Sequence, residues 1–156
     1  MPDESRPAFI PTWPTCTVVV SCIGAEAFGG ACLAHLSGAI DPYLSRLRPG
    51  SDIDVRGTEL DESLMRRLLG AVTQDGRPVI GTGLFDHATF VGPMRFEGVE
   101  FRGPAGFHDA TFTGTVQFND VRAGVLEFVN ARFEKRTWFG PLIATELNVA
   151  RVRCAA

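Results

Sequence analysis

The chain has 156 residues, of which 45% are hydrophobic and 21% are charged, a composition typical of a single globular domain or of two small ones. A formal net charge of −3 argues against non-specific nucleic-acid binding, which needs a basic surface. The same value argues almost as firmly against a strongly acidic mimic of DNA. Twelve phenylalanines against one tyrosine favour an interior built from many similar dry positions.

Residues 1–38 are expected to form a tail and a leader rich in cysteine and histidine. The opening, MPDESRPAFIPTWP, is acidic, rich in proline and without the apolar stretch of a signal peptide. We therefore expect a cytoplasmic protein whose first twelve residues form a mobile tail. In that compartment cysteines are expected to be thiols or metal ligands rather than disulfides.

The leader contains a candidate metal site. Cys16, Cys22, Cys32 and His35 fall within twenty residues, and the last two stand in the compact sequence Cys-Leu-Ala-His. Three thiols and one imidazole are the ligands of a closed tetrahedral zinc site, which would be structural because no position stays open for a substrate. Two alternatives remain: burial of the cysteines as small core residues, or a disulfide between two of them.

Residues 39–78 are expected to form a helical capping region. Asp41-Pro42 predicts the start of a short helix over 43–48, which Pro49-Gly50 ends. The alternation in Ser51–Gly57 predicts a strand. Asp61 is predicted to cap a second helix, whose apolar side chains form one stripe. That stripe consists of Leu64, Met65, Leu68, Leu69 and Val72.

Residues 79–156 carry a short repeat. Phenylalanines stand at positions 85, 90, 96, 101, 107, 112, 118, 128, 133 and 139, mostly five or six residues apart. A strand has a period of two and a helix of 3.6, so neither keeps a five-residue spacing on one face. A four-sided coil does, with one large side chain pointing inward from each side and the glycines Gly92, Gly103 and Gly114 at corners. Such repeats must stack to bury their apolar side chains.

The two ends of this coil differ. The second helix is positioned to cover the N-terminal end. The C-terminal end has no comparable cover, and an open end recruits other chains. Formation of a homodimer through the C-terminal end of the coil is therefore one hypothesis.

The repeat resembles the pentapeptide-repeat proteins in their phenylalanine-rich variant, through the units ATF, VEF, ATF and ARF. The leader segments WPTC, SCIG, ACLAHL and PGSDIDVRGT are similar to those that precede such repeats in actinobacterial proteins. The resemblance implies a mainly β fold, a right-handed quadrilateral β-helix, capped by a small N-terminal region that contains helices. Some relatives protect DNA gyrase by imitating duplex DNA, but eight Arg and Lys residues offset the acids of this repeat.

No catalytic or cofactor-binding residue is predicted. His87 and His108 stand near the same phase of the repeat beside Asp86 and Asp109, so adjacent coils can bring imidazole and carboxylate together on a solvated outer face. The expected function is a non-enzymatic module that presents a rigid repeat face to a protein partner, without binding nucleic acid or membrane. The alternatives are a DNA-mimic modulator of a topoisomerase, and an enzyme or enzyme accessory with a pocket between leader and coil.

Overall fold

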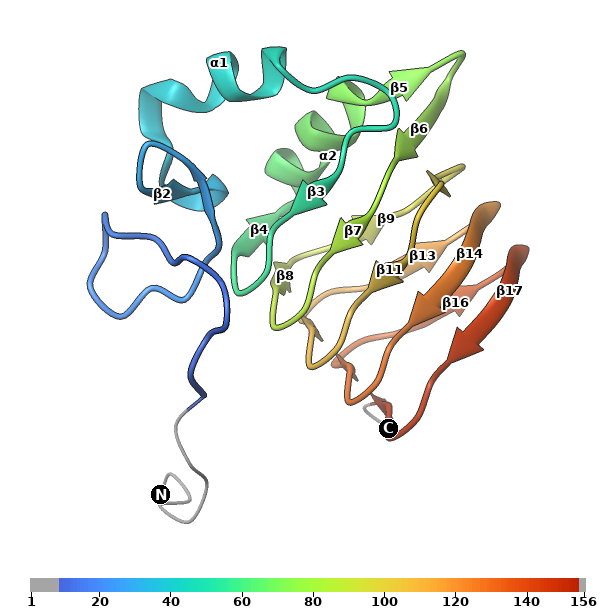
Figure 1. Cartoon of the computed structure of the whole chain (residues 1–156). Coiled ribbons are helices and arrows are strands. Elements are labelled where there is room, and N and C mark those ends of the chain that lie inside the picture. Colours follow the sequence, from blue (N-terminus) through green and yellow to red (C-terminus); the bar gives the residue numbers. More distant parts are fainter. Residues whose placement is uncertain (1–8, 155–156) are drawn as a thin grey trace.

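A four-sided coil of short parallel strands makes up the C-terminal half of the protein (Figure 1). The computed structural model describes residues 9–154. Thr111 pairs with Thr89, 22 residues earlier, and with Arg132, 21 residues later, so one turn of the coil takes 21 or 22 residues. This is the length of four sides of five or six residues, and the predicted β-solenoid is confirmed.

Stacked strands form the four walls. Wall one contains β6 (Arg77–Ile80), β10 (Glu100–Phe101) and the first halves of β14 (Val121–Glu127) and β17 (Leu142–Asn148). Wall two contains β3 (Ile53–Asp54), β7 (Gly83–Leu84), β11 (Ala105–Gly106) and the second halves of β14 and β17. Wall three contains β4 (Glu59–Asp61), β8 (Thr89–Val91), β12 (Thr111–Phe112), β15 (Arg132–Phe133) and β18 (Arg153–Cys154). Wall four contains β9 (Met94–Arg95), β13 (Val116–Phe118) and β16 (Thr137–Phe139).

Phenylalanine rings fill the interior in columns. Neighbouring rings within a column are stacked, with centroids 4.6 to 5.1 Å apart. The three columns are Phe85–Phe107–Phe128, Phe90–Phe112–Phe133 and Phe96–Phe118–Phe139. Alanines at 88, 110 and 131 are fully buried beside them, as the repeat pattern predicts. Each buried ring contributes roughly 1.5–3 kcal/mol through removal of its surface from water.

The glycines predicted at corners do lie between walls: Gly92 and Gly114 between walls three and four, and Gly103 between walls one and two. Gly92 has a φ of +83°, but Gly103 and Gly114 do not adopt the left-handed conformation. Gly114 is needed for another reason, because a Cβ there would lie 2.3 Å from the backbone carbon of Gly92 in the adjacent coil. The corner between walls two and three is left-handed in every turn, and four of its five residues are not glycine. These residues are Gly57, His87, Asp109, Asn130 and Arg151.

Helix α2 (Glu62–Ala71) covers the N-terminal end of the coil, as predicted. The side chain of Asp61 accepts a hydrogen bond of 2.7 Å from the Leu64 N–H and so caps the helix. Met65 and Leu68 are buried in the same core as the phenylalanines. After the helix, β5 (Thr73–Gln74) forms an antiparallel hairpin with β6.

Helix α1 (Ile40–Ser45) begins earlier than predicted, and Asp41 is not its N-cap. A 3-10 turn over Ser37–Ala39 leads directly into this helix, so the chain is already helical when it reaches Asp41-Pro42. Pro42 is tolerated because the first turn of a helix leaves its N–H groups without partners. Asp41 instead forms an ion pair with Arg67 of α2.

The leader packs onto the same end of the coil. Its hairpin of β1 (Glu26–Phe28) and β2 (Ala31–Cys32) runs into a 3-10 helix over Leu33–His35. Leu33 and Leu36 are buried in the common core, so the leader contributes to the cap together with α2. Of the expected mobile tail, residues 1–8 lie outside the described part, whereas the ring of Phe9 stacks on His87 at 3.7 Å.

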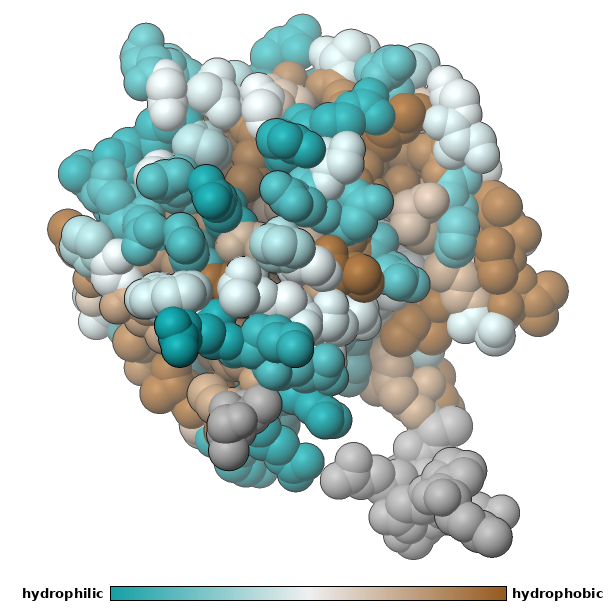
Figure 2. Space-filling view, turned by 180° about the vertical axis from the view of Figure 1, so that it is seen from behind, coloured by the Kyte–Doolittle hydropathy of each residue, from teal (hydrophilic) through white to brown (hydrophobic). Residues whose placement is uncertain are grey.

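Among the described residues, nothing covers the C-terminal end of the coil. The last ring of one column, Phe139, is 47% exposed, and Leu147 and Val149 are about half exposed. Trp138 and Ile143 add exposed apolar surface to the outside of the same turn. Figure 2 shows hydrophobic surface at the lower left of the molecule, on the side where the last turn of the coil lies in this reversed view.

None of the helices formed by residues 9–154 is long and apolar enough to span a membrane.

Candidate metal centre and groove

The predicted ligands come together from four separate places in the leader. The N–H of Cys16 donates to the carbonyl of Gly24, and the N–H of Cys22 closes a turn on Val19. Cys32 ends β2, and His35 ends the 3-10 helix that follows. A 3-10 helix has three residues per turn, so the imidazole of His35 returns to the side of Cys32.

The four ligand atoms all lie within 4.8 Å of one another, so a single metal ion can contact all of them. His35 Nδ1 lies 3.4 Å from Cys16 Sγ, 3.6 Å from Cys22 Sγ and 3.3 Å from Cys32 Sγ. The Sγ atoms of Cys22 and Cys32 are 3.9 Å apart, far beyond the S–S bond length of about 2.05 Å. All four cysteines of the chain are free thiols, so the disulfide alternative is not realised.

Glycine at position 24 permits this packing. A Cβ there would lie 2.8 Å from Cys32 Cβ and 2.9 Å from Cys32 Sγ. The Gly24 N–H also points at Cys22 Sγ, at 3.4 Å. The sequence SCIG therefore supplies the ligand Cys22 and, through Gly24, the space that the ligand Cys32 occupies.

The thiols differ in their electrostatic environment. Burial raises the pKa of the Cys16 thiol, but hydrogen bonds from the backbone of Cys32, Val18 and Val19 and from His35 outweigh it and lower the pKa to about 6. Burial raises the pKa of the Cys32 thiol to about 12, and the negative charges of Cys22 and Cys16 act in the same direction. The charge of one thiolate therefore disfavours ionisation of the neighbouring thiol. All three thiols can be ionised together only when a cation lies between them.

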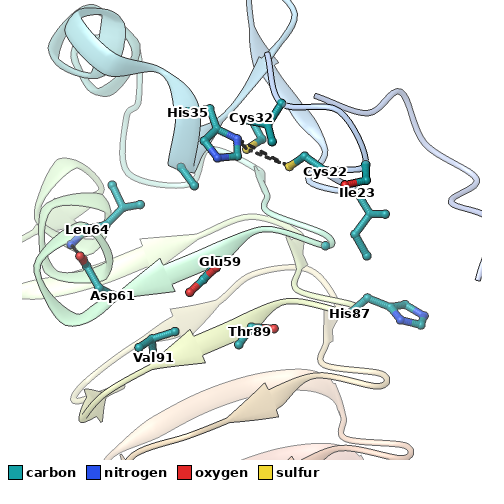
Figure 3. Close-up of a pocket in the computed structure, with 14 residues that line it drawn as sticks. Cys22, Ile23, Cys32, His35, Glu59, Asp61, Leu64, His87, Thr89 and Val91 are labelled. Atoms are coloured by element: carbon teal, nitrogen blue, oxygen red, sulfur yellow. Dashed lines mark hydrogen bonds between the residues drawn. The ribbon is translucent and has the colours of Figure 1, made fainter. Parts of the chain in front are cut away.

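A groove of about 750 Å³ separates the leader from the outer face of wall three (Figure 3). Cys22, Cys32 and His35 line its leader side. The strands β4 and β8 form the opposite side and contribute Glu59, Asp61, Thr89 and Val91. Nothing in the pattern around Glu59 marks it as a groove residue, because the groove exists only where the leader folds back over β4.

The two histidines of the repeat lie outside the metal centre. His87 Nε2 is 3.5 Å from an Asp109 carboxylate oxygen, and His108 Nε2 is 3.1 Å from a Glu127 carboxylate oxygen. The expected approach of imidazole and carboxylate from adjacent coils is therefore confirmed. All four side chains are partly exposed on the outside of the coil.

These observations define the class of protein: a four-sided β-solenoid with a helical N-terminal cap and a Cys₃His cluster able to hold a metal ion. Residues 81–122 and 96–140 match the family of pentapeptide repeats, so the coil is built from pentapeptide repeats. The match begins at residue 81, after the leader has ended, so it says nothing of the Cys₃His cluster. No curated protein and no solved structure matches the chain.

Proposed function

We propose that the protein is a non-enzymatic, cytoplasmic interaction module, which presents a rigid coil to a protein partner and pairs with a second copy through its open end. The observation that carries the proposal is the last turn of the coil, where the ring of Phe139 stacks on Phe118 at 5.1 Å on one side and is open on the other. A stacked wall loses little conformational entropy when it binds, so it suits recognition.

The geometry of the open end fits a second copy. The strands β16, β17 and β18 each pair with only one neighbour among the described residues, which leaves an edge of unpaired N–H and C=O groups. Two coils placed end to end would continue the columns of rings and pair these edges. Phe139, Leu147 and Val149 would be removed from water.

The oligomeric state tests this proposal. Light scattering after size exclusion, at tens of micromolar, is expected to give twice the 16.9 kDa mass of one chain. Phe139→Asp places a charge in the contact and is expected to give monomers. Thr115→Asp, which adds the same charge at an exposed position on the side of the coil, is the matched control and should leave the dimer intact. A monomeric wild type under these conditions would rule out the end-to-end pair.

We further propose that the Cys₃His cluster binds one structural zinc ion. A tetrahedral zinc with Zn–S near 2.3 Å and Zn–N near 2.0–2.1 Å needs S···S distances of about 3.8 Å and S···N distances of about 3.5 Å. The separations in the leader, 3.9 Å for one sulfur pair and 3.3 to 3.6 Å from the imidazole, agree with those values. Zinc would fix the leader against the coil, because this glycine-rich segment has little core of its own.

Elemental analysis of protein purified without chelator tests the zinc proposal. We expect about one zinc per chain in the wild type and in Cys154→Ser, whose thiol lies exposed at the far end of the coil. Cys32→Ser is expected to lose the metal. A wild type with less than about 0.1 zinc per chain would leave burial of the thiols as the role of the cluster.

The charge pattern favours the interaction module over mimicry of DNA. Mimicry needs a continuous acidic stripe along one side. The outer residues of wall three instead change from Glu59 and Asp61 through Thr89 and Thr111 to Arg132 and Arg153. An enzymatic role would have to use the groove between leader and coil. We propose binding there instead, because no catalytic residue is predicted from the sequence.

A further inference from the structure

We propose that the groove beside the metal centre binds an extended peptide segment with basic side chains, which adds a strand to the free edge of β4. The inference rests on the proposed interaction role and names a second surface for it, at the opposite end of the coil from the open turn. Three observations carry it: the strand edge, the shape of the groove and its charge.

The edge of β4 is available for pairing. Among the described residues, β4 is the last strand of its sheet and pairs only with β8. The Thr89 N–H donates to the carbonyl of Thr58, and Glu59 is paired in register with Thr89. In a parallel pair, only every second residue of a strand directs its backbone N–H and C=O groups toward a given neighbour. With this register, residues 58 and 60 face β8, so the N–H and C=O of Glu59 point away from β8. Those two groups face the leader side, where a preceding turn of the coil would lie.

The groove has room for a strand at this edge. The leader contacts the chain just before β4, where the Ala25 N–H donates to the carbonyl of Arg56. Among the described residues it forms no strand pair with β4 itself and leaves the cavity of about 750 Å³ beside it. Figure 3 shows Glu59 on β4 between the Cys/His cluster above and Thr89 below. Leu64, Val91, Val19 and Ile23 supply apolar surface around this position. A peptide added here would gain main-chain hydrogen bonds from the edge and side-chain contacts from the groove.

The charge of the groove selects a basic occupant. Glu59 and Asp61 are exposed carboxylates, and none of the ion pairs in the described residues involves either of them. Asp61 uses one oxygen to cap α2, which leaves the other free. With zinc bound, three thiolates and a neutral imidazole would add a net charge of −1 beside them. Side chains point to alternate faces of a strand, so lysines at every second position would meet these carboxylates together.

The probe is a fluorescein-labelled, end-capped peptide of alternating lysine and valine, Lys-Val-Lys-Val-Lys, added to the full chain and followed by fluorescence anisotropy. We expect saturable binding that weakens as salt is raised. The peptide Glu-Val-Glu-Val-Glu should not bind, and N-methylation of alternate backbone nitrogens of the lysine peptide should abolish binding because it removes strand pairing. Equal binding of the acidic or the N-methylated peptide would overturn the inference.

A pair of double variants locates the site. Glu59→Gln combined with Asp61→Asn is expected to weaken binding about tenfold, since each exposed charge pair contributes up to about 1 kcal/mol. Asparagine also caps helices, so this variant should keep α2. Glu97→Gln combined with Glu100→Gln changes the net charge equally at sites that do not line the groove, and it should bind like the wild type. Equal weakening in both doubles would contradict the site.

Failure of this inference is distinguishable from failure of the proposed dimer. Phe139→Asp, designed to open the dimer, leaves the groove unchanged and should bind the lysine peptide as the wild type does. Chemical-shift changes on peptide addition should centre on Glu59, Leu60 and Thr89. If they instead centre on the last turn of the coil, the peptide binds the open end and the groove inference is wrong.

Discussion

At the scale of single residues, position within a column decides how much a phenylalanine contributes. Phe112 is fully buried and stacks between Phe90 at 4.6 Å and Phe133 at 4.8 Å. Its ring also meets Phe118 edge to face at 6.1 Å. Phe139 has a stacked neighbour on one side only. The repeat pattern predicts that both rings point inward. Their burial differs because Phe112 lies in the middle of a column and Phe139 lies at the end of one.

Phe112→Ala is expected to lower the free energy of unfolding by about 3–5 kcal/mol, because stacked walls cannot collapse into the hole. Phe139→Ala should cost less than about 2 kcal/mol, since that ring is already half exposed. Urea denaturation, at a protein concentration low enough to keep the chain monomeric, measures the free energy of unfolding of both variants. Similar losses for the two variants would contradict a packed column.

The left-handed corner gives a second prediction at this scale. Asn130 has a φ of +58° and an exposed side chain, so its backbone conformation matters more than its contacts. Asn130→Gly should leave the stability nearly unchanged, whereas Asn130→Val should lower it by about 1–2 kcal/mol through crowding of the branched Cβ. Thermal unfolding of the two variants measures the difference, and equal midpoints would argue against a strained corner.

The left-handed conformation of the corner between walls two and three was not predicted from the sequence. The glycines at 92, 103 and 114 mark other corners, whereas the left-handed corner between walls two and three contains Asp109 and Asn130. Aspartate and asparagine tolerate this conformation better than most residues, so the signal was present at positions 109 and 130. Histidine carries a weaker signal of the same kind at His87. Arg151 carries none, and its conformation follows from pairing with the preceding turn.

At the scale of elements, α2 was predictable because its signals are local. The capping aspartate and the apolar stripe stand within a few residues of each other, and the helix has the predicted N-cap and buried face. The start of α1 was not predictable from Asp41-Pro42, because the helical conformation enters from the preceding 3-10 turn. Local capping signals therefore identify a helix only where the chain arrives extended, as it does at Asp61 with a ψ of 174°.

Removal of the α2 cap tests its contribution to the stability of the coil. Asp61→Ala is expected to lower the free energy of unfolding by about 0.5–2 kcal/mol, because the Leu64 N–H loses its acceptor at the helix start. Asp61→Asn keeps an acceptor and should stay within a few tenths of the wild type. If the asparagine variant is destabilised as much as the alanine variant, charge rather than capping is the cause. Chemical denaturation followed by circular dichroism measures both.

At the scale of the whole molecule, each turn of the coil contacts only the turns beside it, so the length of the coil should be adjustable in whole turns. Deletion of residues 108–128 removes one turn of 21 residues and joins Phe107 to Val129 in register. The shortened chain is expected to fold with lower stability. Deletion of residues 108–125 removes 18 residues, moves the following rings off their columns and is expected to prevent folding. Far-ultraviolet circular dichroism and urea denaturation compare them, and equal behaviour would contradict the solenoid register.

The repeat in the sequence is enough to predict the coil and its inward-pointing rings. A short repeat whose turns contact only their neighbours specifies each position through residues close in the chain. The sequence also supplied the types and order of the candidate metal ligands. Only the tertiary structure decided that Cys16, Cys22, Cys32 and His35 meet, and that the leader leaves a groove over β4. Those arrangements depend on how a segment without a repeat folds back onto the coil, and contacts between parts so distant leave no periodic signal in the sequence.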